Sequence, residues 1–443
     1  MGATVEIPVW LLALGALGLA VAVLDRLVAP TFRWYFRRRL ERAVERLNRS
    51  LSLRIQPFRL MRRAFLVERL GHDPEVMRAV EAHVAETGMP RDIAHRLVGE
   101  YAREIVPSFS AFMYFGVGAR LCRWVAEALY KVRLGAFDRA ALAEIDPEAA
   151  VVFVINHRSN VDYLLVTHLA SGAASLSYAV GEWARIWPLS RVIRNMGAYF
   201  IRRRERGALY RTVLRRYVQM AVEGGVTQAV FPEGGLSRDG AQGEPKLGIL
   251  SYIVEAKAER DVIFVPVGVN YDRVLEDRLL LSAYGPHGAG RFNVKPRVAL
   301  GFLLGWAFGR LTGRASRFGY AAVGFGAPLR LGGFAGGPEA LAAELMRRIG
   351  AATPVLPVGL VAAALEAGAA DRAALAAGAE ALARRLEDAG AHFVMPQAGL
   401  AAAVEAGLAQ LLLRRVVAEE GGRLTVRDAQ LLAFYARSAA LPR

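Results

Sequence analysis

The sequence predicts an α/β fold in which a mixed sheet is flanked by helices, with helical regions before and after it and one apolar helix at the amino terminus. Three observations lead to this expectation. Short β-rich runs alternate with helical patterns between about residues 136 and 335. Hydrophobic residues make up 54% of the chain and charged residues 22%, which excludes a disordered chain and a bundle of membrane spans. One unbroken apolar run occupies residues 7–24.

This run, IPVWLLALGALGLAVAVL, is long enough to cross the hydrocarbon core of a bilayer. At about 1.5 Å per helical residue it reaches about 27 Å, against a core of about 30 Å. Glu6 is the only charge ahead of it, whereas a signal peptide opens on Lys or Arg, so we expect a retained transmembrane anchor. A buried core helix or a shallow interfacial helix is the alternative.

Positive charge follows the run directly. The chain carries a net charge of +16, and residues 26–70 hold thirteen Arg against three Glu. Because positive flanks stay on the cytoplasmic side, we expect the body of the protein on the cytoplasmic face of a cell membrane, in contact with membrane lipid. The alternative for Arg42, Arg46 and Arg49 is that they lie on a solvent-exposed helix face and contact no lipid. No zinc-finger spacing, RNP-like strand or P-loop is present, so nucleic acid is not an expected partner.

The chain divides into four parts by composition. We expect an anchor at 1–29, a basic helical region at 30–135 with a break near 88–90, an α/β domain at 136–335 and an Ala-rich helical region at 336–443. A helix is predicted around 209–221, where apolar residues recur at helical spacing. The predicted strands lie within residues 150–156, 197–203, 227–234, 261–271 and 318–331.

The most informative segment is Asn156-His157-Arg158-Ser159-Asn160-Val161-Asp162, which follows the first of these strands. Ligands bind at the carboxyl ends of strands in α/β sheets. An aspartate that accepts from one imidazole nitrogen fixes the tautomer and makes the other nitrogen a better base. His157 could then deprotonate an alcohol, with Asp162 as its partner. Taken alone, a His-x4-Asp pattern more often marks a capped helix start than a catalytic pair.

Glycines and arginines follow other predicted strand ends. After the run at 227–234, Gly234 lets backbone amides approach an anion, and Arg238 offers a planar fork for phosphate. Arg202 follows the strand at 197–201, and Pro266 lies in the strand at 261–271. The single cysteine, Cys122, excludes a disulfide framework and a multi-cysteine zinc site, and we expect neither a metal nor a cofactor.

Four blocks therefore occur in order: NHRSNVDYLL at 156–165, GAYFIRR at 197–203, VFPEGGLSR at 230–238 and VIFVPVGVNYD at 262–272. As a set they resemble the glycerol-3-phosphate O-acyltransferases of the membrane-bound bacterial type, with the related dihydroxyacetone-phosphate acyltransferases. The resemblance covers about residues 90–430 and implies a glycerolipid acyltransferase-type domain at the bacterial inner membrane. The chain is much shorter than the long bacterial enzymes of this family.

The resemblance also implies residue roles. His157 would be the general base and Asp162 its orienting partner. Arg158, Arg202 and Arg238 match positions that hold glycerol phosphate. The third block contributes Glu233, Gly234 and Ser237 to the substrate site, and Pro266 matches the fourth block, on the side of the acyl donor.

The expected function is transfer of a fatty acyl group from acyl-CoA or an acyl carrier protein thioester to the sn-1 hydroxyl of glycerol 3-phosphate. Dihydroxyacetone phosphate and 1-acylglycerol 3-phosphate are alternative acceptors for the same mechanism. A hypothesis from a different class is a non-catalytic membrane adaptor that binds anionic lipid through residues 26–70. It explains the charge but not the four blocks. The oligomeric state and the acyl-chain preference are left open by the sequence.

Overall fold

The computed structural model describes residues 8–10, 15–16, 29–181, 189–202, 207–284, 301, 305, 309 and 317–439. The predicted anchor at 7–24 lies outside these ranges, apart from residues 8–10 and 15–16. Among the helices that can be described, none is both long enough and apolar enough to cross a membrane. The amino-terminal anchor therefore stays a prediction.

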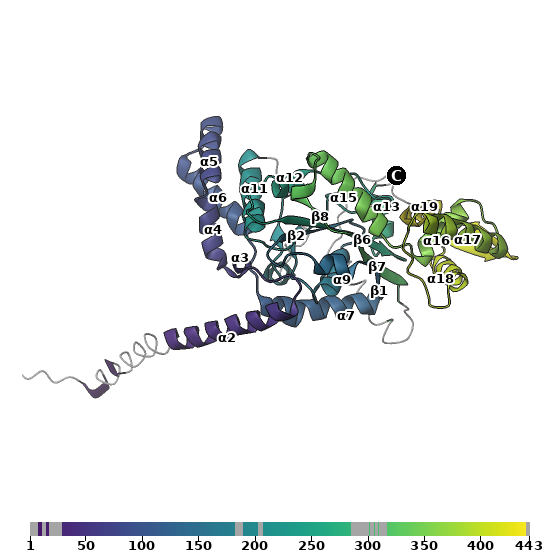
Figure 1. Cartoon of the computed structure of the whole chain (residues 1–443), viewed down its shortest axis with the longest axis horizontal. Coiled ribbons are helices and arrows are strands. Elements are labelled where there is room, and N and C mark those ends of the chain that lie inside the picture. The colour runs from purple at the N-terminus through teal and green to yellow at the C-terminus, as the bar shows by residue number, and fades with distance from the viewer. Residues whose placement is uncertain are drawn as a thin grey trace, which may run out of the picture.

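A mixed sheet forms the centre of the molecule (Figure 1), which confirms the α/β class. Its eight strands in the described part of the chain are β1 (Lys131–Phe137), β2 (Ala150–Ile155), β3 (Ser177–Val180), β4 (Tyr199–Phe200), β5 (Gln228–Val230), β6 (Val262–Tyr271), β7 (Tyr320–Phe325) and β8 (Leu329–Arg330). Their order is β1-β7-β6-β2-β5-β3-β4, with β8 also paired to β6. Strands β2 to β6 run parallel, whereas β7 and β8 are antiparallel to β6, and β1 is parallel to β7.

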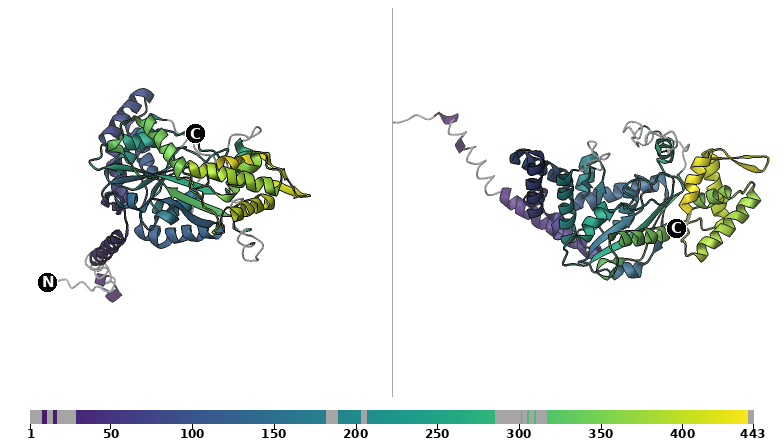
Figure 2. Two further views of the ribbon diagram at one scale, coloured as in Figure 1. Left: turned by 45° about the vertical axis from the view of Figure 1, so that its right-hand side comes forward. Right: turned by 90° about the horizontal axis from the view of Figure 1, so that it is seen from above.

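Helices cover both faces of the sheet (Figures 1 and 2). One face packs against α4 (Arg63–Gly71), α5 (Pro74–Thr87), α6 (Arg91–Ile105), α11 (Ala208–Glu223), α12 (Gly248–Val254) and α15 (Pro338–Ala352). The other packs against α7 (Ala119–Leu129) and α9 (Asp162–Ala170), and its core continues into α16 (Pro357–Glu366), α17 (Arg372–Asp388), α18 (Leu400–Leu413) and α19 (Ala429–Ala436). Every residue of β2 and β6 is buried, as expected for central strands that read as continuous apolar runs.

The remaining described elements are shorter or peripheral. They are α2 (Ala29–Ser50), α3 (Pro57–Leu60), η2 (Phe112–Gly118), α8 (Arg139–Ala143), α10 (Leu189–Asn195), α13 (Asp277–Tyr284), η4 (Leu331–Gly333), β9 (Val417–Glu420), β10 (Arg423–Val426) and η5 (Arg437–Ala439). Helix α2 leads away from the body in both views of Figure 2, and its carboxyl end packs against the segment that precedes and begins η2.

Several sequence predictions are confirmed. The helical break near 88–90 is present, because Gly88 ends α5 in the left-handed region (φ 68°) and α6 begins at Arg91. The helix around 209–221 is α11, and the strands expected at 150–156 and 261–271 are β2 and β6.

Three expectations need correction. Residues 318–331 form two strands, β7 and β8, because the strand is interrupted at residues 326–328, opposite Pro266 of β6. Strand β1 begins at Lys131, inside the region predicted to be helical and five residues before the expected domain boundary at 136. The carboxyl-terminal region is not helical throughout, since β9 and β10 form an antiparallel hairpin.

Candidate active site

The first block forms a turn between β2 and α9. Asn156 extends the ladder with its side chain: Nδ2 donates to the Val269 carbonyl (3.0 Å), and Oδ1 accepts from the Val269 amide (2.7 Å). This pair holds the chain to β6 just after the backbone pairing of β2 ends at Ile155. The chain therefore leaves the sheet at a defined residue and enters α9 at Asp162.

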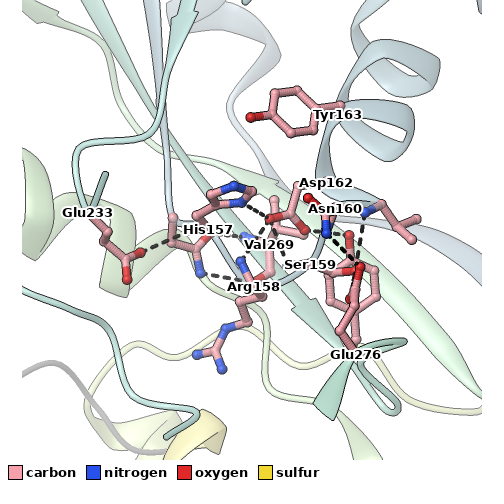
Figure 3. A network of polar contacts seen from close by, with 12 residues as sticks. His157, Arg158, Ser159, Asn160, Asp162, Tyr163, Glu233, Val269 and Glu276 are labelled. Atoms are coloured by element: carbon pink, nitrogen blue, oxygen red, sulfur yellow. Dashed lines mark hydrogen bonds and ion pairs between the residues drawn. The ribbon is translucent and has the colours of Figure 1, made fainter. Parts of the chain in front are cut away.

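The turn brings His157 and Asp162 together in the interior (Figure 3). His157 Nδ1 lies 2.9 Å from Asp162 Oδ2, and the two side chains are 2% and 0% exposed. The same oxygen accepts from the backbone amides of Arg158 (2.8 Å) and Ser159 (3.1 Å). Because an ionised carboxylate only accepts, Nδ1 carries the proton and Nε2 keeps the lone pair that a base needs. The predicted contact is present, and the catalytic role of the pair stays a prediction.

Tyr271, the last residue of β6, holds the other oxygen of Asp162. Its hydroxyl donates to Asp162 Oδ1 over 2.6 Å. Burial and the neighbouring Asp162 carboxylate raise the pKa of Tyr271 well above its ordinary value, so the phenol stays protonated and can donate. Tyr271 lies in the fourth block, and its position in the sequence does not indicate a contact with the first block.

Aromatic side chains set the plane of the His157 ring. Phe231 stacks on the imidazole with centroids 4.1 Å apart, and Tyr163 meets it edge-on at 5.6 Å. His157 is 1% exposed, and within the described ranges its Nε2 atom has no hydrogen-bond partner. The ring therefore has one fixed nitrogen and one nitrogen whose lone pair is unused.

Two residues of the third block form hydrogen bonds with the backbone of His157, one with its amide and one with its carbonyl. Glu233 Oε1 accepts from the His157 amide and its Oε2 from the Gly243 amide, each at 2.9 Å. The Ser237 amide donates to the His157 carbonyl (2.8 Å), and the Ser237 hydroxyl donates to Ala241 O (2.6 Å). Burial raises the pKa of Glu233. Two of the predicted site residues thus lie beside the dyad and hold its main chain.

Gly234 lies in the same block with φ at +66°, a conformation that favours glycine. A Cβ atom there would come within 2.9 Å of the Lys246 side chain, so that lysine lies over the glycine. Lys246 is exposed and has no ion-pair partner among the residues described. Lys246 was not among the site residues predicted from the sequence, because it lies outside the four blocks.

The three predicted arginines lie in different surroundings. Arg158 is buried, donates to the Gly240 carbonyl (2.6 Å) and points away from the imidazole in Figure 3. Arg202 follows β4 and pairs with Glu104 of α6 through three contacts of 2.7 to 3.0 Å. Arg238, the last residue of the third block, is exposed.

Pro266 lies inside β6, opposite Val154 in the ladder. The ladder of β8 reaches Phe264 and that of β7 begins at Val267, so the proline occupies the gap where a missing amide donor is tolerated. Pro266 therefore lies within the sheet and not in the turns that follow the strand ends.

Glu276 is a further residue that the sequence did not reveal. It follows the fourth block, is buried, and accepts from the Ser159 hydroxyl (2.7 Å). Its other oxygen accepts from the Asn160 amide (3.2 Å) and side-chain nitrogen (3.0 Å). Burial raises the pKa of Glu276. The middle of the His157–Asp162 turn is therefore held from outside the four blocks. In the described ranges, no three His, Cys, Asp or Glu side chains are grouped so as to hold a metal ion.

Comparison with known proteins relates this geometry to a family model. Residues 139–270 match the family model described as Acyltransferase. The chain is therefore similar to acyltransferases over this segment. Tyr271 and Glu276 lie just beyond the matched segment, whereas His157, Asp162 and Glu233 lie within it.

Curated proteins similar to this chain are named glycerol-3-phosphate acyltransferases. Glycerol-3-phosphate acyltransferase of Actinobacillus succinogenes is 29% identical over 280 residues, 62% of this chain and 33% of the relative. That of Pseudomonas putida is 30% identical over 61% of this chain and 32% of the relative, and that of Pseudomonas aeruginosa strain PAO1 is 28% identical over 73% and 42%. The resemblance based on the four blocks is confirmed, although the match spans less than half the length of these relatives.

A solved structure is also similar. It is the 1-acyl-sn-glycerophosphate acyltransferase PlsC from Thermotoga maritima, with 18% identity and a TM-score of 0.32 over 64% of this chain and 93% of that one.

Proposed function

We propose that this chain transfers a fatty acyl group from an acyl thioester to the sn-1 hydroxyl of glycerol 3-phosphate. The observation that carries the proposal is the buried His157–Asp162 pair at the end of β2, inside a domain that matches the acyltransferase model. The curated relatives that align with it are named glycerol-3-phosphate acyltransferases.

The proposed reaction needs one proton carrier. His157 Nε2 removes the proton of the acceptor hydroxyl as its oxygen attacks the thioester carbonyl carbon. Asp162 stabilises the imidazolium that forms, because its carboxylate already accepts from Nδ1. When the tetrahedral intermediate collapses, the C–S bond breaks, the thiolate leaves and takes up the proton. The acyl group passes directly between the two substrates.

The phosphate end of the acceptor needs cationic side chains on the solvent-exposed side of the site. Arg238 and Lys246 are exposed at the loop that carries Gly234, and we assign the phosphate to this side of the site. Arg158 has a different role in this proposal, since its buried guanidinium lies near the Glu233, Asp162 and Asp239 carboxylates and balances their charge. Arg202 stays a candidate for binding phosphate in exchange for Glu104.

Other acceptors use the same chemistry. Dihydroxyacetone phosphate offers the same phosphate, and 1-acylglycerol 3-phosphate offers the sn-2 hydroxyl. The third block reads FPEGGLSR rather than the FPEGTRS typical of lysophosphatidate enzymes, which favours glycerol 3-phosphate. The donor is an acyl-CoA or an acyl carrier protein thioester.

A matrix of three acceptors against the two donors tests the proposal, using the full chain, His157→Ala and a control, His168→Ala. His168 lies on α9 beside Glu127 and does not contact Asp162. We expect glycerol 3-phosphate to be the preferred acceptor and His157→Ala to lose at least about a hundredfold in kcat, while His168→Ala keeps its rate. Preference for the monoacylated acceptor would reverse the ranking, and a wild-type chain with no turnover would favour the membrane adaptor.

We also propose that residues 7–24 anchor the chain in the bacterial inner membrane with the acyltransferase domain on the cytoplasmic face. An exposed apolar face on η2 and α7 supports a membrane contact. Phe112 (70% exposed), Val117, Leu121 and Trp124 (68%) follow at intervals of five, four and three residues, which places them on one side of a helix that is π-wound at its start. Exposed arginines flank this face at positions 120 and 123.

A further inference from the structure

The last α-helix of the carboxyl-terminal region contacts the start of α13, shortly after the end of β6. Tyr435 of α19 donates its hydroxyl to Asp277, and Arg414, just after α18, pairs with the same carboxylate at 2.6 Å. Arg414 also donates to the Tyr435 oxygen (2.9 Å), which accepts from the Val274 amide (3.0 Å) as well. Burial and Asp277 raise the pKa of Tyr435, so its proton stays in place for this contact.

Asp277 is next to a residue that holds the catalytic turn. Its neighbour Glu276 accepts from the Ser159 hydroxyl and from two nitrogens of Asn160, in the turn between His157 and Asp162. The contacts of Tyr435 and Arg414 with Asp277 therefore hold the main chain next to Glu276, whose carboxylate binds the turn.

A second contact supports the end of β6, from which Tyr271 reaches Asp162 Oδ1. The Ser438 carbonyl in η5 accepts from Asn270 Nδ2 (3.2 Å), which also donates to the Pro354 carbonyl (2.9 Å). Asn270 precedes Tyr271, whose hydroxyl donates to Asp162. The carboxyl-terminal region thus holds the end of β6 from which this donor projects.

A third contact supports the loop after the third block. Gly240 (φ +85°) packs so closely on α19 that a Cβ atom would lie 1.8 Å from the Phe434 carbonyl oxygen. Arg158 donates to the Gly240 carbonyl, and the Gly240 amide donates to the Ser237 hydroxyl (3.1 Å). In Figure 3 the yellow ribbon of the carboxyl-terminal region passes below Arg158.

We infer that α19, η5 and Arg414 are a positioning element for the acyltransfer site, which we call the carboxyl-terminal clamp. Three separate positions of the sheet region, 240, 270 and 277, are each held by the clamp, and each is adjacent to or bonded to a residue that contacts the His157–Asp162 turn. Packing alone would not require all three contacts to converge on one turn. The clamp rests on the proposed function for its catalytic consequence, but not for its geometry.

Tyr435→Phe tests the clamp in the full chain, because it removes the hydroxyl and keeps the ring. Arg372→Ala is the matched control: it breaks ion pairs with Glu405 and Glu419 inside the same region and touches none of the three positions. We expect Tyr435→Phe to lower kcat roughly three- to tenfold with acceptor KM within about twofold, because it removes the contacts of the hydroxyl with Asp277, Arg414 and the Val274 amide. Hydrogen exchange of the amides at 158–160 should become faster in Tyr435→Phe and stay unchanged in Arg372→Ala.

A double-mutant cycle with Glu276→Ala tests the route. If the clamp acts through Glu276, adding Tyr435→Phe to Glu276→Ala lowers kcat little further; fully multiplicative losses would overturn that route. Unchanged kcat and unchanged exchange in Tyr435→Phe, or equal changes in the control, would overturn the clamp itself. The exchange measurement needs no turnover, so an inactive wild-type chain would reject the proposed function while leaving the clamp open to confirmation or rejection.

Discussion

The Asp162 carboxylate accepts hydrogen bonds unequally on its two oxygens. Oδ2 accepts from His157 Nδ1 and from two backbone amides in the turn before α9, whereas Oδ1 accepts from the Tyr271 hydroxyl. A buried carboxylate without donors is costly, so each of these contacts also fixes its orientation. The orientation of Asp162 in turn fixes which nitrogen of His157 carries the proton.

Replacing Tyr271 with Phe tests this orientation at the scale of one atom. The variant keeps the ring but leaves Oδ1 buried without its donor, so we expect kcat to fall roughly tenfold with little change in acceptor KM. Tyr130→Phe is the control, because Tyr130 is equally buried, packs 5.3 Å from the Tyr271 ring and donates to the Arg273 carbonyl instead. Steady-state kinetics that show equal losses for both variants would contradict a specific role for Tyr271.

The sequence could predict the dyad but not its supports. His157 and Asp162 are five residues apart, so a turn at a strand end suffices to bring them together. Tyr271 and Glu276 lie 109 and 117 residues from their partners, and only the pairing of β6 with β2 brings them to the turn. Spacing along one segment carries no information on such contacts.

At the scale of elements, the long central strands were predictable, whereas the interior strand β3 and the edge strand β1 were not. The central strands β2 and β6 read as continuous apolar runs, whereas β1 has polar and exposed positions typical of an edge. The β9–β10 hairpin did have a local signal: Gly421 and Gly422 both adopt positive φ, as a two-residue hairpin turn requires. The Ala-rich surroundings favoured a helical interpretation instead.

The proposed membrane contact explains why large apolar side chains are exposed on one face of η2 and α7. Helix α7 packs its Cys122, Ala126 and Leu129 side inward and turns Leu121 and Trp124 outward. Large apolar side chains gathered on one exposed face mark a contact surface, and flanking arginines suit anionic headgroups.

Site-directed spin labelling tests this contact independently of the amino-terminal anchor. Burial raises the pKa of Cys122 to about 12, so the native thiol stays protonated and a label can be directed to Trp124→Cys. With vesicles of anionic lipid, the label at 124 should become accessible to oxygen and shielded from a water-soluble nickel complex. Leu413→Cys, at an apolar position 66% exposed on α18, is the control and should stay accessible to nickel. Persistent nickel accessibility at 124 would contradict the contact.

At the scale of the whole molecule, Asp272 joins the sheet to the carboxyl-terminal region. It follows β6, accepts from the Tyr320 amide of β7 (2.7 Å) and from the Val358 amide of α16 (2.9 Å), and is 3% exposed. Burial raises its pKa from 3.8 to about 6, although the two amides and Lys131 oppose the shift. The folded protein therefore binds this proton more tightly than the unfolded chain does.

The sign of the resulting pH dependence follows from linkage. Below about pH 4 the stabilising contribution of protonated Asp272 is fully present, and it is lost as pH rises through about 6, a change of about 3 kcal/mol for a shift of this size. Urea unfolding between pH 4 and 7 should show stability falling across this window, and Asp272→Asn should flatten the fall whatever its overall stability. Asp261→Asn, at an exposed carboxylate paired with Arg330, is the control and should keep the full slope. Glu233 and Glu276, whose pKa values burial also raises, add to the fall in the same direction, so some slope remains in Asp272→Asn; an unchanged slope would show that Asp272 does not hold its proton in the folded state.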